Sequence, residues 1–155
     1  MIENTCCFFG NRTINETEEL KCKLKRIVEK LITEEKVDTF LFGSKSRFND
    51  LCLEIVTEIR KKYPHIKRIY VRAEYQFIDD DYKNYLLKDY EDTYYPQKII
   101  RSGRAAYVER NYEMINNSRF CVVHHYQKNV LAIRKSGTGI ALDYALQHRK
   151  EIIMT

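Results

Sequence analysis

Short apolar runs alternate with longer amphipathic stretches along the whole chain. Five short runs rich in apolar residues have the length of strands: residues 5–9, 39–42, 66–71, 120–123 and 152–154, of which 66–71 is interrupted by Lys67 and Arg68. Between them, apolar residues recur at helical spacing over residues 20–32 and 48–59, with shorter helical patterns at 82–87, 105–117 and 140–145. Buried strands that alternate with amphipathic helices are typical of a parallel sheet with helices on both faces. We therefore predict an α/β, doubly wound fold with a mainly parallel sheet.

Local signals indicate where the helices end and how far the domain extends. Asn15 and Glu18 stand at the spacing of a capping box, so we expect Asn15 to cap the first helix. Pro64 ends the second helix. The length of 155 residues is ordinary for one domain, and no repeat, linker or low-complexity tract divides the chain. We predict a single domain over residues 1–155.

Charge and tyrosine are unevenly distributed along the chain. The net charge is +5, yet residues 74–92 carry seven acidic residues and two lysines, so this segment sums to −5 and the remainder to +10. Seven of the twelve tyrosines lie between residues 70 and 95. We call residues 74–95 the acidic tyrosine-rich segment; its tyrosines could stack on a base, form an oligomer interface or cover a sheet edge. The basic remainder favours an anionic partner. Because the acidic tyrosine-rich segment offsets part of this charge, the net charge alone does not identify that partner.

The composition excludes two broad classes of protein. With 44% hydrophobic and 32% charged residues, the chain is typical neither of a disordered protein nor of a membrane protein. No apolar stretch approaches the roughly 18 residues of a membrane span. Residues 1–4 show neither the basic start nor the apolar run of a signal peptide, and the five cysteines form no Cys-x-x-Cys pair. We expect a cytoplasmic protein with reduced thiols and no membrane partner.

Three loops that follow predicted strands contain the candidate ligand-binding residues. They are Gly10-Asn11-Arg12, Gly43-Ser44-Lys45-Ser46-Arg47 and Ser136-Gly137-Thr138-Gly139, the last preceded by Arg134-Lys135. In a doubly wound sheet, ligands bind at the carboxyl ends of the strands. Small residues, cationic side chains and helix N-termini suit a phosphate or another compact anion. Alternatively, Gly10 and Gly43 serve only tight turns.

Other candidate sites have weaker signals. His124 and His125 stand together at a strand end, but no carboxylate or cysteine accompanies them at ligand spacing, so we predict no metal site. The run Asp79-Asp80-Asp81 fits a solvated loop or a helix start better than a metal site. Neither Gly-x-Gly-x-x-Gly nor a Walker loop occurs in the sequence, and we predict no cofactor.

Several motifs resemble the YpsA-type branch of the SLOG superfamily, which also includes the DprA proteins and the lonely-guy phosphoribohydrolases. The opening TCCFFGNR at residues 5–12 is similar to the branch's "TCCFTGHR", and YPHIK at 63–67 to its "YPHIK". ERNYEMINNS at 109–118 resembles "KRNRYMVDHSD", and residues 136–153 resemble "GGTAYTVKYAKRKGIPV". The resemblance implies a Rossmann-like fold with a pocket for nucleotide-derived ligands. Its lining would include Gly10, Arg12, Gly43, Arg110 with Asn111, and Gly137 with Thr138.

The chain departs from the family pattern at positions that matter for chemistry. Asn11 replaces the family histidine, and the second loop lacks the glycines of "GGALGFDTLA". The hydrolases resemble "PGGxGTxxE", where the glutamate partners an arginine equivalent to Arg110; here Ala141 stands in its place. Asp143 lies two residues farther on, roughly 200° around an ideal helix, and cannot simply replace it. Because cleavage of an N-glycosidic bond commonly needs a carboxylate, hydrolysis is disfavoured.

The sequence therefore favours a non-catalytic module that binds a nucleotide or nucleotide-sugar at the carboxyl ends of the strands. One alternative is an N-glycosidase or phosphoribohydrolase that uses Arg110 with Asp143 or an acid of the 74–92 segment. A second is single-stranded nucleic-acid binding through the basic remainder, which we consider less favoured. A third is an interaction module that uses the acidic tyrosine-rich segment, and homo-oligomerisation is also open.

Overall fold

Six parallel strands form one sheet in the order β4-β3-β2-β1-β5-β6. The structure is a computed structural model that describes residues 2–43, 45–125 and 136–155. The strands are β1 (Thr5–Gly10), β2 (Thr39–Phe42), β3 (Lys67–Val71), β4 (Asp92–Tyr94), β5 (Phe120–His124) and β6 (Glu151–Met154). The helices are a 3-10 turn η1 (Ile2–Asn4), α1 (Glu18–Thr33), α2 (Arg47–Arg60), α3 (Asp80–Leu86), α4 (Arg104–Asn116) and α5 (Gly137–Gln147). This arrangement confirms the predicted Rossmann-like, doubly wound fold.

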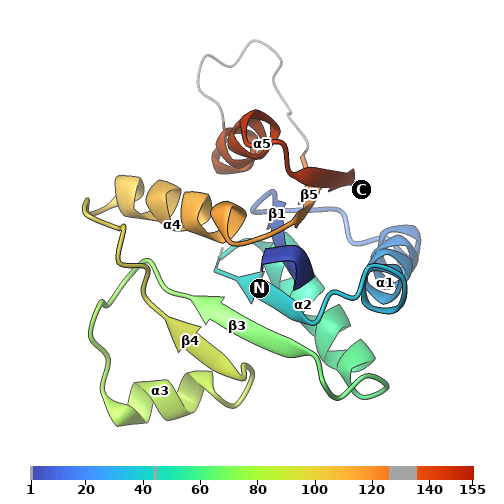
Figure 1. Cartoon of the computed structure of the whole chain (residues 1–155), viewed down its shortest axis with the longest axis horizontal. Helices are drawn as coiled ribbons and strands as arrows, with labels where there is room; N and C mark the ends of the chain where they lie inside the picture. The colour runs from blue at the N-terminus through green and yellow to red at the C-terminus, as the bar shows by residue number, and fades with distance from the viewer. Residues whose placement is uncertain (1, 44, 126–135) are drawn as a thin grey trace.

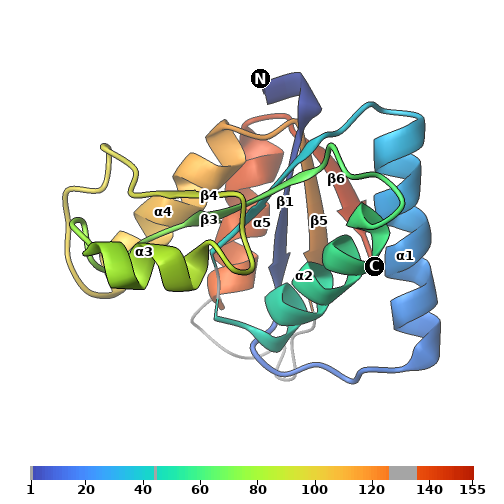
Figure 2. The ribbon, with the colours of Figure 1, turned by 90° about the horizontal axis from the view of Figure 1, so that it is seen from below.

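The helices cover both faces of the sheet. Helices α1, α2 and α3 lie on one face, and α4 and α5 lie on the other (Figures 1 and 2). Successive side chains of a strand point to opposite faces. In β1, Phe8 therefore packs in the core beneath α1 and α2, whereas Cys7 and Phe9 pack in the core beneath α4 and α5. Both faces of the central strand are buried, which explains why residues 5–9 read as a continuous apolar run.

The expected elements are present, with two differences, in the cap of α1 and in strand β4. Thr17 rather than Asn15 caps α1, because the Thr17 side chain accepts a hydrogen bond from the Leu20 N–H at 3.1 Å. The three-residue β4 had no sequence signal; it pairs with the edge of β3. Asp79 caps α3, so the run of three aspartates is a helix start. Within the described residues, no helix is long and apolar enough to cross a membrane.

Candidate functional site

The carboxyl ends of β1 and β5 mark the point where the strand order reverses. Strands β2, β3 and β4 follow on one side of β1, and β5 and β6 lie on the other. Gly10 pairs with His124, and the Asn11 N–H donates a hydrogen bond to the His124 carbonyl at 3.2 Å. Asn11 is half-buried and Arg12 is exposed. The first predicted loop thus lies where ligands bind in sheets of this kind.

The protein itself fills the space beside Gly10. A Cβ atom at this position would lie 2.2 Å from the ring of Phe48, in the first turn of α2. The Phe48 ring stacks on the His124 imidazole with centroids 5.4 Å apart. His124 Nδ1 in turn lies 2.6 Å from Thr155 Oγ1. Gly10 is required for the close approach of α2 to β1, which accounts for this glycine without a ligand.

Gly43, at the end of β2, allows α4 to approach the sheet closely. A Cβ atom here would lie 2.9 Å from Arg110 Cδ and 3.0 Å from Met114 Sδ. Arg110 Nη1 donates a hydrogen bond to the Gly43 carbonyl at 2.5 Å, and Arg110 Nε donates one to Asn111 Oδ1 at 3.0 Å. The structure therefore brings together three of the predicted residues, Gly43, Arg110 and Asn111.

The Arg110 guanidinium is a buried positive charge. The residue is only 5% exposed, and burial lowers the pKa of Arg110 to about 10, although Tyr70 and Glu74 partly oppose that shift. Its guanidinium carbon lies 5.5 Å from the centroid of the Tyr107 ring. Over residues 2–43, 45–125 and 136–155, no aspartate or glutamate forms an ion pair with Arg110. Because an unpaired buried charge is costly, the site is suited to an anionic ligand.

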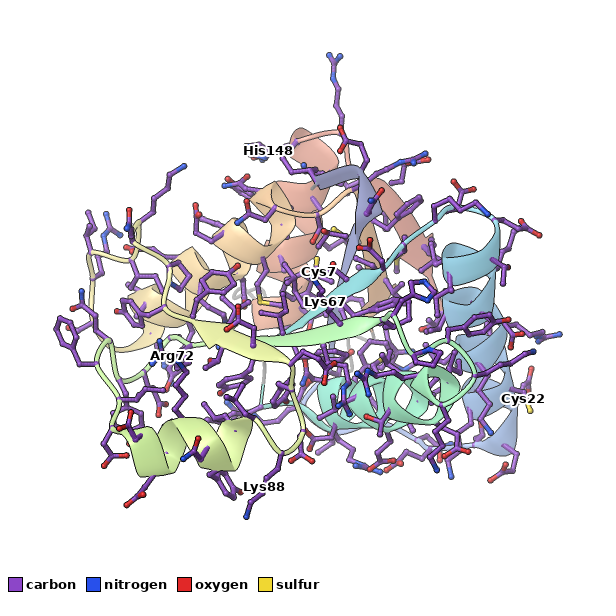
Figure 3. All side chains as sticks on the ribbon, turned by 60° about the horizontal axis from the view of Figure 1, so that its bottom comes forward. Cys7, Cys22, Lys67, Arg72, Lys88 and His148 are labelled. Carbon is purple, nitrogen blue, oxygen red and sulfur yellow. The ribbon has the colours of Figure 1, made fainter. Side chains whose placement is uncertain are left out.

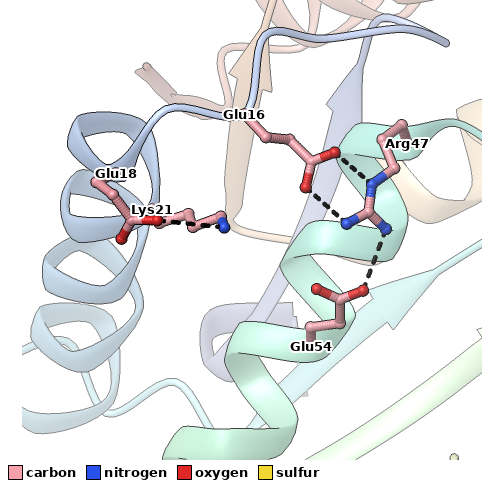
Figure 4. Close-up of polar contacts among 5 residues, drawn as sticks. All are labelled: Glu16, Glu18, Lys21, Arg47 and Glu54. Atoms are coloured by element: carbon pink, nitrogen blue, oxygen red, sulfur yellow. Dashed lines mark hydrogen bonds and ion pairs between the residues drawn. The ribbon is translucent and has the colours of Figure 1, made fainter.

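Arg47, one of the two cations of the second loop, is already neutralised. Its guanidinium donates two hydrogen bonds to Glu16, at 2.6 and 2.7 Å, and one to Glu54 at 3.1 Å (Figure 4). These contacts raise the pKa of Arg47 further above its usual value. Ser46 caps α2 by accepting a hydrogen bond from the Asn49 N–H. This part of the loop fixes the start of α2 and offers no available charge to a ligand.

Lys45, the other cation of the second loop, contacts the acidic tyrosine-rich segment. Lys45 Nζ lies 3.1 Å from Glu74 Oε1, and this contact raises the pKa of Lys45. The Tyr107 hydroxyl donates a hydrogen bond to the same carboxylate oxygen. Glu74 thus connects the loop after β2 with α4, close to Arg110. Ser44, the other predicted residue of this loop, lies outside the described residues.

The third predicted loop leads into α5, which packs beside α4 (Figure 1). Ser136 caps the helix by accepting a hydrogen bond from the Gly139 N–H at 3.1 Å. Thr138 and Gly139 are buried, whereas a Cβ atom on Gly137 would meet no heavy atom within 4 Å. The first N–H groups of a helix have no partner inside it and favour anions. Arg134 and Lys135, which precede this loop, lie outside the described residues.

A cavity of about 350 Å³ opens between the second loop and α3. Lys45 lines it together with four tyrosines, Tyr70, Tyr82, Tyr85 and Tyr90. The rings of Tyr82 and Tyr85 stack with centroids 6.3 Å apart, and those of Tyr70 and Tyr90 lie 5.3 Å apart at a tilt. Burial raises the pKa values of Tyr70 and Tyr90, so both phenols stay neutral near pH 7. Part of the acidic tyrosine-rich segment is therefore a wall of this cavity.

Arg72 is a buried cation at the carboxyl edge of the sheet that sequence reasoning missed. It follows β3 directly and lies at the end of that strand, above α3 (Figure 3). The residue is 9% exposed; its Nη1 donates a hydrogen bond to the Tyr75 carbonyl at 3.2 Å, and its buried Nε has no hydrogen-bond partner. The sequence could have indicated Arg72 by its position immediately after a predicted strand, because such a position lies at the carboxyl edge of the sheet.

Helix α5 carries the two positions that bear on the hydrolase pattern, Ala141 and Asp143. Ala141 is 1% exposed and packs in the core beneath α4 and α5, so a buried methyl group occupies the position of the hydrolase glutamate. Asp143 is half-buried farther along α5. In the part of the chain that the structure describes, no three His, Cys, Asp or Glu side chains are placed to hold a metal ion.

Comparison with known proteins supports the fold assignment. No protein-family model matches the sequence, and no curated protein matches it. The structure is similar to that of DNA processing protein A from Helicobacter pylori, with a TM-score of 0.64 and 13% sequence identity. The alignment covers 99% of this chain and 65% of that one, a protein described as binding single-stranded DNA. The likeness confirms the Rossmann-like fold, and the assignment to the SLOG superfamily and its YpsA-type branch stays a prediction from sequence.

Proposed function

We propose that this chain binds a nucleotide or nucleotide-sugar at the carboxyl ends of its parallel strands, without hydrolysing it. The observation that carries the proposal is the buried guanidinium of Arg110, which has no carboxylate partner in the described ranges. A phosphate would supply the missing counter-charge, and arginine binds phosphate oxygens through two parallel hydrogen bonds. The ligand would thus stabilise a charge that is costly in its absence.

The surroundings of Arg110 favour a compact phosphorylated ligand. Lys45 lines the neighbouring cavity, and Tyr70, which also lines it, is close enough to act electrostatically on Arg110; Glu74, which forms an ion pair with Lys45, partly offsets the positive charge there. The N-terminus of α5 adds oriented N–H groups at the carboxyl edge of the sheet, beside α4. The buried Ala141 disfavours glycosidic hydrolysis, because no carboxylate stands there to stabilise the developing positive charge.

Calorimetric titration with ADP-ribose, AMP and cyclic dinucleotides tests this function. We expect saturable binding of at least one of them and loss of that binding when Arg110 is replaced. Chromatography of the mixture after prolonged incubation should show no free base. Release of free base would instead support the N-glycosidase alternative. Glu74, which acts electrostatically on Arg110, would then be the candidate carboxylate.

Single-stranded nucleic-acid binding is the second candidate, favoured by the structural likeness to DNA processing protein A. Two exposed aromatic side chains, Tyr75 and Phe77, lie on the loop between β3 and α3 and are 64% and 87% exposed. Exposed rings beside cationic loops are the elements that stack unpaired bases. Titration of fluorescent oligo-dT at several salt concentrations tests it. This mode predicts an affinity that falls steeply with salt, whereas undetectable binding at low salt excludes it.

A further inference from the structure

The tyrosine-lined cavity carries an unequal distribution of charge. Besides Lys45 and the tyrosines, Asp50 on α2 and Asp89 after α3 line the cavity. Neither carboxylate forms an ion pair with a lysine or arginine within the described residues. Partial burial raises the pKa of Asp50, although the nearby charge of Arg47 opposes part of that rise. The lining of the cavity therefore combines two carboxylates with one lysine, and that lysine forms an ion pair with Glu74.

These charges determine how a bound nucleotide would be oriented in the cavity. A phosphate would be repelled by the two carboxylates and attracted to Lys45 and Arg110. A neutral base would be stabilised by stacking on the tyrosine rings, because any base offers a π face to an aromatic side chain. Tyr70 links the two regions, since it lines the cavity and also acts electrostatically on Arg110. The base would lie in the cavity and the phosphate outside it.

The carboxylates also restrict which base fits. An ionised carboxylate only accepts hydrogen bonds, so the edge of the base that faces it must donate them. Exocyclic amino groups supply such donors on adenine, guanine and cytosine, whereas the matching positions of hypoxanthine and uracil are carbonyl or unsubstituted. A carbonyl oxygen facing Asp50 or Asp89 would be repelled.

We propose that the cavity is the base subsite and that Asp50 and Asp89 make it select nucleotides whose base carries an exocyclic amino group. This inference rests on the proposed nucleotide-binding function and adds the class of base. Tyr82 and Tyr85 supply stacking contacts common to all bases, and the two carboxylates supply the discrimination.

Calorimetric titration with matched monophosphates tests the inference on the full chain. GMP and IMP differ only by one amino group, while AMP and IMP, or CMP and UMP, differ by an amino group in place of a carbonyl. We expect the amino-bearing member of at least one pair to bind about tenfold more tightly. Asp89→Asn or Asp50→Asn should reduce that preference several-fold. Asp81→Asn, a change in the same acidic segment but outside the cavity, should leave it unchanged.

Three outcomes would overturn the inference, and they are distinguishable. If every nucleotide binds through Arg110 but the members of each pair bind equally, the base selection is wrong and the proposed function stands. The same conclusion follows if the preference survives in both Asp50→Asn and Asp89→Asn. If no monophosphate binds but ADP-ribose or a cyclic dinucleotide does, the inference fails and the proposed function stands; if none of these ligands binds, both fail. A Tyr82→Ala variant adds a second readout, because it should weaken both members of a pair equally, by about fivefold or more.

Discussion

Replacing Arg110 by methionine removes a buried positive charge and keeps much of the volume of the side chain. The lowering of the Arg110 pKa from its usual 12.5 to about 10 corresponds to a cost of about 3 kcal/mol for keeping the charged form in this environment. The substitution relieves that cost. It also removes the hydrogen bond to the Gly43 carbonyl, worth about 2 kcal/mol, and the contact with the Tyr107 ring, worth about 1 kcal/mol.

These contributions nearly cancel, so we expect the free energy of unfolding of Arg110→Met to lie within about 1 kcal/mol of the wild-type value. Urea denaturation followed by circular dichroism measures this difference. Arg68→Met is the matched control, because Arg68 is also buried but donates hydrogen bonds to both carboxylate oxygens of Glu91, at 3.1 and 2.7 Å. Losing the Arg68 pair should cost about 2 kcal/mol or more, because the partly buried Glu91 would keep Arg60, 3.3 Å away, but lose two short hydrogen bonds.

The two variants should differ in nucleotide affinity in the opposite sense to their difference in stability. Arg110→Met should weaken binding at least about tenfold, whereas Arg68→Met should leave it unchanged at temperatures where the variant is folded. If Arg110→Met instead loses as much stability as Arg68→Met, the guanidinium is a structural element. The reasoning from an uncompensated charge would then be refuted.

Three further predictions concern other contacts of the site and the fold. Glu74→Gln should strengthen nucleotide binding several-fold in calorimetric titrations, because it frees Lys45 from its ion pair; weaker binding would argue that Glu74 holds the lysine in place for the ligand. Gly10→Ala should lower the free energy of unfolding by about 2 kcal/mol or more in urea denaturation, because the new methyl group meets the Phe48 side chain from its Cβ to its ring. An unchanged free energy of unfolding would show that α2 can move away from β1 at no cost. Burial alone would raise the pKa of Glu91, but hydrogen bonds from Arg68 hold this pKa below its usual value. The stability that the Arg68–Glu91 pair supplies is therefore complete above about pH 5 and is lost as the pH falls through the lowered pKa of Glu91. The free energy of unfolding of the wild type should thus fall more steeply between about pH 5 and pH 3 than that of Glu91→Gln.

Much of the fold could be predicted because burial on both sides of a parallel sheet leaves a continuous apolar run. Strands β1 and β5 were evident for that reason, and residues 20–32 showed the periodicity of α1. Strand β4 was not evident, since its three residues have no pattern of their own and form a strand only by pairing with β3. The cap of α1 was misplaced because Asn15 and Thr17 are both good caps, and the choice depends on which side chain reaches a helix N–H.

The location of the candidate site was predictable, but the state of its charges was not. The rule that ligands bind at the carboxyl ends of parallel strands placed Gly10 and Gly43 at the correct edge. The partners that neutralise the second loop lie far away in sequence: Glu16 is 31 residues from Arg47, and Glu74 is 29 residues from Lys45. Only the folded structure shows that both cations already form ion pairs with these carboxylates.

The central claim is that Arg110 holds the phosphate of a nucleotide-derived ligand. Titration of the wild-type chain and of Arg110→Met with ADP-ribose and AMP, under identical buffer and salt, tests it most directly. The account predicts saturable heat from at least one ligand with the wild-type chain, and binding at least about tenfold weaker with the folded variant. Equal affinities of the two proteins, or no heat from the wild-type chain with either ligand, would contradict it.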